Sequence, residues 1–338
     1  MSRSERSATV GDVARHAGVS PGTVSKALNG RGQLRQETRD RVLRAAQELG
    51  FQPNLLAQGL LTGRTYTVGV LTTDSIGRFT IPLLSGAEDA LGAGQMSLLL
   101  CESRGDPIRE QHYVQRLLAR RVDGIIVTGR SSDVRPSLGR DFPIPVVYAL
   151  TTSEDPEDVS ITHDDTQGAG LAVRHLLETG RRRIAMVSGP AHHASSQNRL
   201  RGTLDALEEV GEHLVGDAPL FGDWSERWGR EAAIRLLRSG AEFDGVFCAS
   251  DQIARGVADG LRENSVNVPL DVGVVGVDNW DVMAEAARPP LTTVDLNLGE
   301  LGHVAATRLL ALIDGDEVPR GVERVPCRLV PRQSTAVD

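Results

Sequence analysis

Residues 11–20 of the chain read GDVARHAGVS, and residues 23–29 read TVSKALN. The first run contains the small and apolar residues of one short helix, which Gly18 ends. Ser20 then offers an N-cap oxygen, and Pro21 suits the first position of a second helix, where the missing N–H costs no hydrogen bond. A short helix, a glycine turn and a capped second helix form the layout of a helix-turn-helix.

The pattern extends into three short helices. They are predicted over about residues 10–17, from residue 21 to near residues 29–30, and over about residues 36–49. In the third helix Gly50 is the stop signal, and an apolar stripe at helical spacing comprises Val42, Leu43, Ala46 and Leu49. The remaining core positions predicted for this small unit are Val13, Ala14, Val19, Val24 and Leu28.

Charge is distributed unevenly along the chain. The whole chain has 37 basic and 45 acidic side chains, a net charge of −8, which taken alone argues against a nucleic-acid partner. Residues 1–64 nevertheless contain ten Arg or Lys and only five Asp or Glu. A basic N-terminal part on an acidic body is expected when only that part has to meet phosphates.

From residue 67 onward, short apolar runs alternate with amphipathic stretches. Such alternation predicts parallel sheets with helices on both faces, and the length of this part favours two lobes with a cleft over one core. The predicted strands are 67–71, 97–101, 124–128, 146–149, 184–188, 245–249 and 272–277. The predicted helices are 82–93, 109–120, 166–179, 199–210, 227–238, 252–264 and 298–313.

These patterns divide the chain into three parts. A helix-turn-helix domain is expected over residues 1–52, a linker over 53–64 and a two-lobed core over 65–338. In the linker, Asn54 can cap one short helix that Gly63 ends, and so short a helix is marginal alone in water. The first lobe is expected to comprise about 65–163 and 295–320, and the second about 164–294 and 321–338.

Several classes of protein are disfavoured. No apolar stretch reaches the length of a membrane span and no signal-like run opens the chain, so a cytoplasmic location is expected. The cysteines Cys101, Cys248 and Cys327 are few, widely spaced and set in apolar runs, which indicates buried reduced thiols. His192 and His193 have no Asp, Glu or Cys at ligand spacing, so neither a metal nor a cofactor is expected.

Enzymatic function is also disfavoured. The sequence GVLTTD at residues 69–74 follows the first predicted strand, and it contains neither G-x-x-x-x-G-K-[ST] nor G-x-G-x-x-G. No G-x-S-x-G nucleophile motif follows a predicted strand either, because the match GVSPG at residues 18–22 lies in the helix-turn-helix. We therefore expect a protein that is not an enzyme.

The segment 11–29 resembles the N-terminus of the LacI/GalR family of bacterial repressors. The resemblance extends through residues 38–39, 49–51 and 53–54 to Leu60. In the rest of the chain the similar landmarks are 122–126, Arg199 with Gly202, 249–251, 274–278 and 289–294. It implies an all-α helix-turn-helix head followed by a two-lobed α/β core like a periplasmic binding protein.

In the family the second helix of the head enters the major groove. The resemblance places Pro21, Gly22 and Lys26 against the bases, and Lys26 is the one strong donor, able to reach guanine O6 and N7. Lys26 is also the only lysine of the chain, although a composition biased toward Arg could leave one lysine there by chance. Candidates for phosphate contacts at this helix are Ser20, Thr23, Ser25 and Asn29.

The resemblance also gives the linker a role. In the family, the bridging helix folds on DNA and inserts a leucine, here Leu60, into the minor groove. Asn54, Leu56 and Ala57 belong to the same short helix. Two departures from the usual pattern, Gln58 and Gly59, lead us to expect that folding of this helix depends more on DNA and on a second subunit.

For the core, the resemblance implies a saccharide site at the carboxyl ends of the strands. A polyol needs a forked donor, hydroxyl acceptors and an aromatic face, which Arg199, Asp278, Ser250 and Trp224 supply. Asp251 is a further candidate, with helix capping an equal alternative. Trp224 could instead pack between elements, and Arg199 and Asp278 could form a structural ion pair.

On the first lobe, three residues that follow the first predicted strand are expected to line the cleft: Thr73, Ser75 and Phe79. Leu150 stands where family members often have aspartate. The sequence therefore leaves open which hydroxyl groups of the effector the site recognises.

The expected function is that of a sequence-specific DNA-binding transcriptional regulator, a repressor, whose operator affinity a small-molecule effector controls. The expected partners are palindromic double-stranded DNA, a mono- or disaccharide bound between the lobes, and a second copy of the chain. The short polar tail at residues 331–338 favours a homodimer over a tetramer. The alternative, a binding protein for sugar uptake, is disfavoured by the DNA-binding head and by the lack of an export signal.

Overall fold

The computed structural model describes residues 8–28, 34–51, 64–75, 77–92 and 96–336. The chain divides into two compact units, Met1–Thr65 and Tyr66–Asp338. Each unit has its own hydrophobic core, so each is described by itself. Residues 53–63 of the predicted linker lie outside the described residues.

The first unit consists of α1 (Val10–Ala17), α2 (Pro21–Leu28) and α3 (Gln36–Glu48). The predicted first helix is confirmed, as is the start of the second at Pro21. A capping box begins α1, because Asp12 donates its N–H to the Thr9 hydroxyl at 3.3 Å and Thr9 donates its own to the Asp12 carboxylate at 2.9 Å. Gly18, at φ +64°, ends the helix in the left-handed region that favours glycine.

The core of the first unit lies where the three helices meet. Val13, Val24 and Val42 are fully buried in it. The prediction that Leu43 faces inward is wrong: its side chain is 45% exposed, and Ala45 is buried instead. The buried face of α3 follows the helical i, i+3, i+4 spacing from Val42. Ala45 and Ala46 therefore face the core, and Leu43 does not. His16 on α1 also contacts Glu48 on α3, at 2.8 Å.

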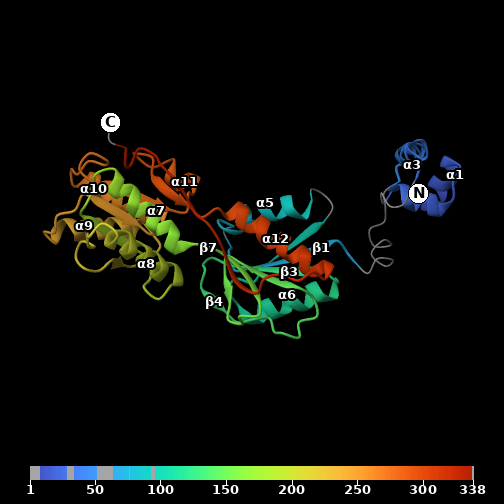
Figure 1. The fold of residues 1–338 in the computed structure, drawn as a ribbon, viewed down its shortest axis with the longest axis horizontal. Coiled ribbons are helices and arrows are strands. Elements are labelled where there is room, and N and C mark those ends of the chain that lie inside the picture. The colour runs from blue at the N-terminus through green and yellow to red at the C-terminus, as the bar shows by residue number, and fades with distance from the viewer. Residues whose placement is uncertain (1–7, 29–33, 52–63, 76, 93–95, 337–338) are drawn as a thin grey trace, which may run out of the picture. The chain divides into compact units, whose positions relative to one another are not determined.

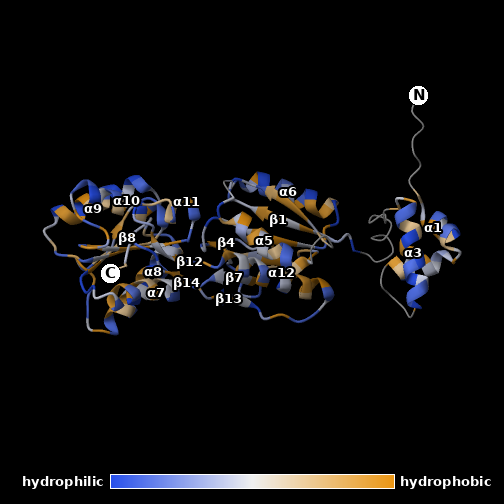
Figure 2. Ribbon diagram, turned by 90° about the horizontal axis from the view of Figure 1, so that it is seen from above, coloured by the Kyte–Doolittle hydropathy of each residue, from blue (hydrophilic) through white to orange (hydrophobic). Residues whose placement is uncertain are grey.

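The first sheet of the second unit has six parallel strands in the order β13-β7-β5-β3-β1-β2. Their bounds are β1 Thr67–Thr72, β2 Ser97–Glu102, β3 Gly124–Thr128, β5 Val146–Ala149, β7 Val159–His163 and β13 Gly321–Val325. Helices α5 (Thr80–Leu91) and α12 (Leu298–Asp314) cover one face, and α6 (Pro107–Ala119) covers the other (Figures 1 and 2). The short strands β4 (Val134–Arg135) and β6 (Thr152–Ser153) pair beside this sheet.

The second sheet has the order β14-β12-β11-β10-β8-β9, parallel except for β14. Its strands are β8 Ile184–Ser188, β9 Leu220–Phe221, β10 Gly245–Cys248, β11 Gly273–Val277, β12 Thr292–Asp295 and β14 Arg328–Val330. Helices α7 (Asp165–Glu178) and α8 (Ala194–Glu208) pack on one face. Helices α9 (Glu226–Arg238) and α10 (Asp251–Glu263) pack on the other, and α11 (Asp281–Ala284) lies beside α10.

Both faces of each sheet are therefore buried, and successive side chains of a strand enter different layers. In β10, Val246 packs with α9 and α10, whereas Phe247 packs with α7 and α8. Figure 2 shows hydrophobic strands between helices whose outer sides are hydrophilic. This burial explains the near-continuous apolar runs in the sequence. The predicted fold class, a helix-turn-helix unit followed by a two-lobed core of parallel sheets flanked by helices, is confirmed.

The chain passes between the two lobes three times. It leaves the first sheet after β7, returns to the first lobe after β12, and crosses again between β13 and β14. The structure contradicts the predicted change of lobe at residue 321, because Gly321–Val325 pairs with β7 in the first sheet. The second lobe resumes only with β14.

Close helix contacts and the C-terminal tail complete the core. Gly202 on α8 lies so near α7 that a Cβ there would be 2.0 Å from the Thr166 carbonyl oxygen. Near the C-terminus, the Ser334 hydroxyl donates to the Val274 carbonyl at 2.5 Å and accepts from the Thr292 N–H at 2.8 Å. The tail thus holds two strands of the second sheet. In the described ranges, no helix combines the length and apolar character needed to cross a membrane.

Candidate functional site

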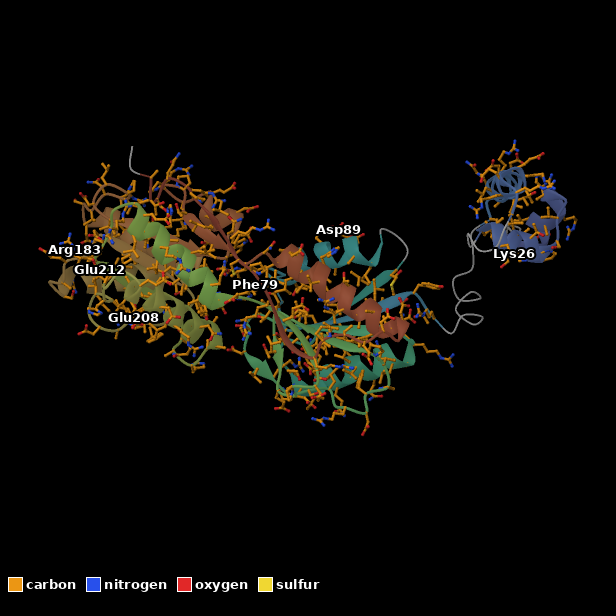
Figure 3. All side chains as sticks on the ribbon, viewed as in Figure 1. Lys26, Phe79, Asp89, Arg183, Glu208 and Glu212 are labelled. Atoms are coloured by element: carbon orange, nitrogen blue, oxygen red, sulfur yellow. The ribbon has the colours of Figure 1, made fainter. Side chains whose placement is uncertain are left out.

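A cavity of about 430 Å³ lies between the two lobes. Its lining residues follow the carboxyl ends of strands in both sheets, for example Ser75 after β1, Arg130 after β3 and Asp278 after β11. Parallel sheets place their binding loops at this edge. Six of the eight predicted effector residues line the cavity: Ser75, Phe79, Arg199, Trp224, Ser250 and Asp278. Phe79 is labelled between the lobes in Figure 3.

Arg199 is held in a buried polar network. It lies on α8 and is 5% exposed, and its Nε donates to Asp165 Oδ1 at 2.7 Å. Its Nη1 donates to the carbonyl oxygen of Ala249 at 2.5 Å. The Asp165 carboxylate also contacts the His163 ring at 3.0 Å and accepts from the Ser132 hydroxyl at 3.2 Å. The guanidinium is therefore fixed in one orientation at the cavity wall.

The network determines the charge state of Asp165. Burial alone would raise the pKa of this carboxyl, but the Arg199 guanidinium and the His163 imidazole outweigh burial and hold the pKa well below its usual range. Burial would likewise lower the pKa of Arg199, but the negative charges of Asp165 and Asp278 together outweigh burial and raise it. Asp165 and Arg199 therefore form a buried, ionised pair.

Asp278 is bound from the opposite lobe. The guanidinium of Arg78, which lies between β1 and α5, forms an ion pair with the Asp278 carboxylate and donates to Gln252 Oε1 at 2.9 Å. The alternative that Arg199 and Asp278 form a structural ion pair is wrong, because each has a different partner. Asp278 also has φ +114°, a strained conformation for a residue other than glycine, and such strain is concentrated at binding sites.

Trp224 both packs and lines the cavity. Its ring lies against Gly189, where an added Cβ would be 2.2 Å from the indole, and its Nε1 donates to His193 Nδ1 at 3.2 Å. It packs against the clusters on both faces of the second sheet. Trp224 therefore does both: it packs against the second sheet and it lines the cavity.

Two predicted residues do not reach the cavity. Asp251 is fully buried and accepts from the Trp280 N–H at 2.8 Å and the Thr293 hydroxyl at 2.5 Å. It does not cap its helix either, because the Ser250 hydroxyl accepts from the Ile253 N–H at the start of α10. Thr73 lines a separate groove beside α6.

Burial and the neighbouring Asp278 carboxylate raise the pKa of Asp251 to about 8. Its bonds to Trp280 and Thr293 keep the carboxyl on the protein side of the wall. The contribution of Asp251 is thus to hold the backbone after Asp278 in place.

Leu150 and the histidines complete the wall. Leu150 is buried with φ +71° and adds an apolar surface to the wall. His163 and His193 also line the cavity. Among the residues that the structure describes, no group of three or more His, Cys, Asp and Glu could hold a metal ion.

The first unit offers a separate candidate interface on α2. Pro21, Gly22, Ser25 and Lys26 are exposed on this helix, whereas Val24 and Ala27 are buried. Ser20 is exposed and caps the helix by accepting from the Thr23 N–H at 3.2 Å; Thr23 is half-buried, and Figure 3 labels Lys26. The other predicted DNA-contacting residues, Asn29, Asn54, Leu56, Ala57 and Leu60, lie outside the described residues.

Both units match known proteins. Residues 9–54 match the family described as bacterial regulatory proteins, lacI family, and residues 173–335 match a periplasmic binding protein-like domain. Catabolite control protein A of Priestia megaterium is 33% identical over 332 residues, which cover 97% of this chain and 99% of that protein. The chain belongs to the LacI family of bacterial regulatory proteins.

Other members of the LacI family agree with this assignment. The ribose operon repressor of Escherichia coli K12 is 32% identical over 305 residues, covering 90% of this chain and 92% of the repressor. A lac repressor dimer bound to operator and the anti-inducer ONPF has a TM-score of 0.75 at 28% identity, over 98% of this chain and 100% of that one. The complex of the regulator CelR with cellobiose has a TM-score of 0.66 at 30% identity, over 97% and 99%.

As a LacI-family protein, the chain is a DNA-binding transcriptional regulator with an effector-binding core. This confirms the function predicted from the sequence.

Sequence reasoning did not find Asp165, His163 or Arg78. Asp165 follows the end of β7, so its position had a signal, but β7 itself was not predicted. No local pattern marks Arg78, because its partners are 174 and 200 residues away along the chain. Both Asp165 and Arg78 act by holding residues that the sequence did identify.

Proposed function

We propose that this regulator is a repressor that binds a palindromic operator as a homodimer, with an operator affinity that changes when a saccharide occupies the cavity between the lobes. Residues 1–52 bind DNA, residues 53–64 form the hinge, and the core from residue 65 binds effector and pairs the subunits. The core switches operator affinity and has no catalytic role. The observation that carries the proposal is the cavity wall, where a fixed guanidinium, a carboxylate and an indole face one space.

The chemistry of the wall suits a polyol. Arg199 supplies forked donors fixed by Asp165, Asp278 supplies an acceptor, and Trp224 supplies an apolar ring. The volume of about 430 Å³ falls within the roughly 300–1,000 Å³ typical of small-molecule sites. Among relatives, a ribose operon repressor and a CelR–cellobiose complex support a saccharide for this chain.

On the DNA side, α2 is the reading helix. Lys26 is placed to donate to guanine O6 and N7 in the major groove, with Pro21 and Gly22 close to the bases. Ser20, Thr23, Ser25 and Asn29 contact phosphates, which orient the helix without reading sequence. Asn54, Leu56, Ala57 and Leu60 form the hinge helix, and Leu60 enters the minor groove at the operator centre.

The two sites are coupled through a two-state core. The saccharide and the operator each favour one arrangement of the lobes, so each ligand changes the binding of the other by the same factor. A homodimer is supported by the solved lac repressor dimer on its operator.

The test is an operator titration, followed by fluorescence anisotropy, with and without mono- and disaccharides. Thermal-shift screening selects the sugars, because a ligand specific to the folded state raises the melting temperature. The double variant Arg199→Met/Asp165→Asn removes the cation with its counter-ion, and should bind operator while losing the response. Leu60→Ala is the reciprocal variant and should lose operator affinity while keeping sugar binding. A full saccharide response in the double variant would remove Arg199 from the site.

A further inference from the structure

Arg78 joins the two lobes across the cleft. It lies in the first lobe, and its guanidinium contacts Asp278 and Gln252, both in the second. The side chains of Arg78 and Asp278 are only 13% and 7% exposed. A charge pair so far removed from water is screened little by salt. The contact is thus part of the cleft and differs from a surface ion pair.

Aromatic rings from both lobes hold the guanidinium in place. Its central carbon lies 4.8 Å from the centre of the Phe79 ring and 4.5 Å from the centre of the Trp280 ring. Both distances are within the range of cation–π attraction. Arg78 is therefore positioned by one ring from its own lobe and by a ring, a carboxylate and an amide from the other.

The carboxylate that Arg78 contacts is the one proposed to accept hydroxyls from the effector. Asp278 lines the main cavity, and one of its two oxygens is already bound by a charged donor. A hydroxyl is a weaker partner for a carboxylate than a guanidinium is. A ligand that needs Oδ2, or both oxygens, of Asp278 therefore has to compete with Arg78.

A second cavity beside Asp278 can receive the Arg78 guanidinium once it is displaced. Arg78 and Asp278 also line this second cavity, of about 310 Å³, whose wall includes Asp281 and Asp295. The ion pair thus forms part of the boundary of both cavities. The exposed Asp281 offers an acceptor for Arg78 when it leaves Asp278, whereas both oxygens of Asp295 already accept from Asn279 and Asn297.

We propose that Arg78 is a specificity-determining residue of the effector cleft, which fastens the lobes by occupying Asp278 and which an effector must displace. Only ligands that replace its contacts gain access to the carboxylate, and their binding unfastens this side of the cleft. The proposal rests on the proposed effector role of Asp278.

The test compares Arg78→Met with the full-length wild type. Methionine keeps an unbranched apolar stem between the two rings but removes the charge. Arg308→Met is the matched control, since Arg308 pairs with Glu323 at 2.9 Å within the first lobe and away from the cleft. The affinity of each protein is measured by calorimetry against D-ribose, D-glucose, D-galactose and cellobiose.

Arg78→Met should bind the best of these sugars at least about tenfold more tightly, because the fraction of protein with a free Asp278 rises. In the Asp278→Asn background the same substitution should change the affinity by less than about twofold, since the competition no longer exists. Weaker or unchanged binding by Arg78→Met in the wild-type background would overturn the proposal.

A second readout needs no ligand. Hydrogen exchange of the amides around residues 77–80 and 278–281 should be faster in Arg78→Met than in wild type or Arg308→Met, because the fastening is lost. Unchanged exchange would overturn the proposal whatever the sugars do. Faster exchange together with no sugar binding in any protein would keep the fastening by Arg78 and refute the proposed saccharide.

Discussion

The helical first unit and the cleft of the core are built in opposite ways. The proposed DNA-reading side chains on α2 come from one helix of eight residues, and their positions follow from a cap, a proline and a helical period. The cleft is assembled from the ends of strands in two sheets, and Arg78 and Asp278 are 200 residues apart along the chain. The proposed DNA-reading surface is thus encoded locally, whereas the proposed effector site exists only after the core has folded.

The largest expected effect tests how far the cleft depends on its buried charges. Arg199→Met leaves Asp165 buried without its main counter-ion, and should lower the free energy of unfolding of the core by about 3–5 kcal/mol. Urea unfolding of the full chain measures the loss. Adding Asp165→Asn should recover part of it, because the unpaired charge is removed. If the double variant is no more stable than Arg199→Met, the loss does not come from the unpaired Asp165 carboxylate.

Acid titration tests the same pair without changing Arg199. The pKa of Asp165 is lower in the folded state than its usual 3.8, so the unfolded chain binds this proton first as the pH falls. The stability from Asp165 is therefore fully present above about pH 4 and is lost toward lower pH. Urea unfolding between pH 5 and pH 3 should show a steeper loss for wild type than for Asp165→Asn. Equal slopes would mean that Asp165 is not held ionised.

A smaller effect is expected from packing alone. Gly202→Ala places a methyl group against the backbone of α7 and should destabilise the core by about 1–3 kcal/mol. Gly299→Ala is the control, because a Cβ there meets no atom within 4 Å. Thermal unfolding of the full chain compares them. Similar melting temperatures for the two variants would show that α7 and α8 can move apart at little cost.

A substitution on α2 of the first unit should change operator binding and leave the stability of the core unchanged. Lys26→Met should weaken operator binding by about 1–3 kcal/mol, the worth of one specific base contact, and leave the thermal unfolding of the core unchanged. Fluorescence anisotropy with the operator measures the affinity, and Arg44→Met on α3 is the control for loss of one positive charge. An equal loss in both variants would indicate that Lys26 contributes charge without base recognition.

The smallest effect concerns the local signal that begins the first unit. Thr9→Ala removes the side-chain half of the capping box and should cost about 1 kcal/mol of helix stability. Hydrogen exchange of the α1 amides should become faster while exchange in the core stays the same. Thr38→Ala, the same substitution within α3, is the control and should leave α1 exchange unchanged. Faster amide exchange in the core of the second unit would contradict the conclusion that each unit is stabilised by its own hydrophobic core.

The fold was predictable where residues are buried in regular layers. Helix α1 and strands β3, β5 and β8 have the predicted bounds, because a helical period or an apolar run defines each of them. Strand β7 was missed because its sequence, VSITH, carries polar side chains that are nonetheless buried next to the cavity. Strand β13 was missed although its exposure alternates, as an edge strand allows. Polar strands close to a site are thus harder to find than apolar ones.

The candidate site was predictable only in part. The family resemblance supplied Arg199, Trp224 and Asp278, and all three line the cavity. The resemblance did not reveal which charged side chains form ion pairs. Pairing depends on how residues far apart in the sequence come together in the fold, and no periodicity in the sequence shows this. Asp251 illustrates the limit: its place after a strand suggested ligand contact, but its carboxylate turns toward Trp280 and Thr293.

The chain alternates between the two lobes, and this order affects how the protein folds during translation. A ribosome releases the chain from its amino end, so the three helices of the first unit can fold while the rest is still being translated. The first sheet lacks an edge strand until Val325 has emerged, and the second lacks the tail bond of Ser334 until translation is almost complete. A premature stop codon at or shortly before Gly321 would therefore leave a DNA-binding head attached to a body with both lobes unfinished.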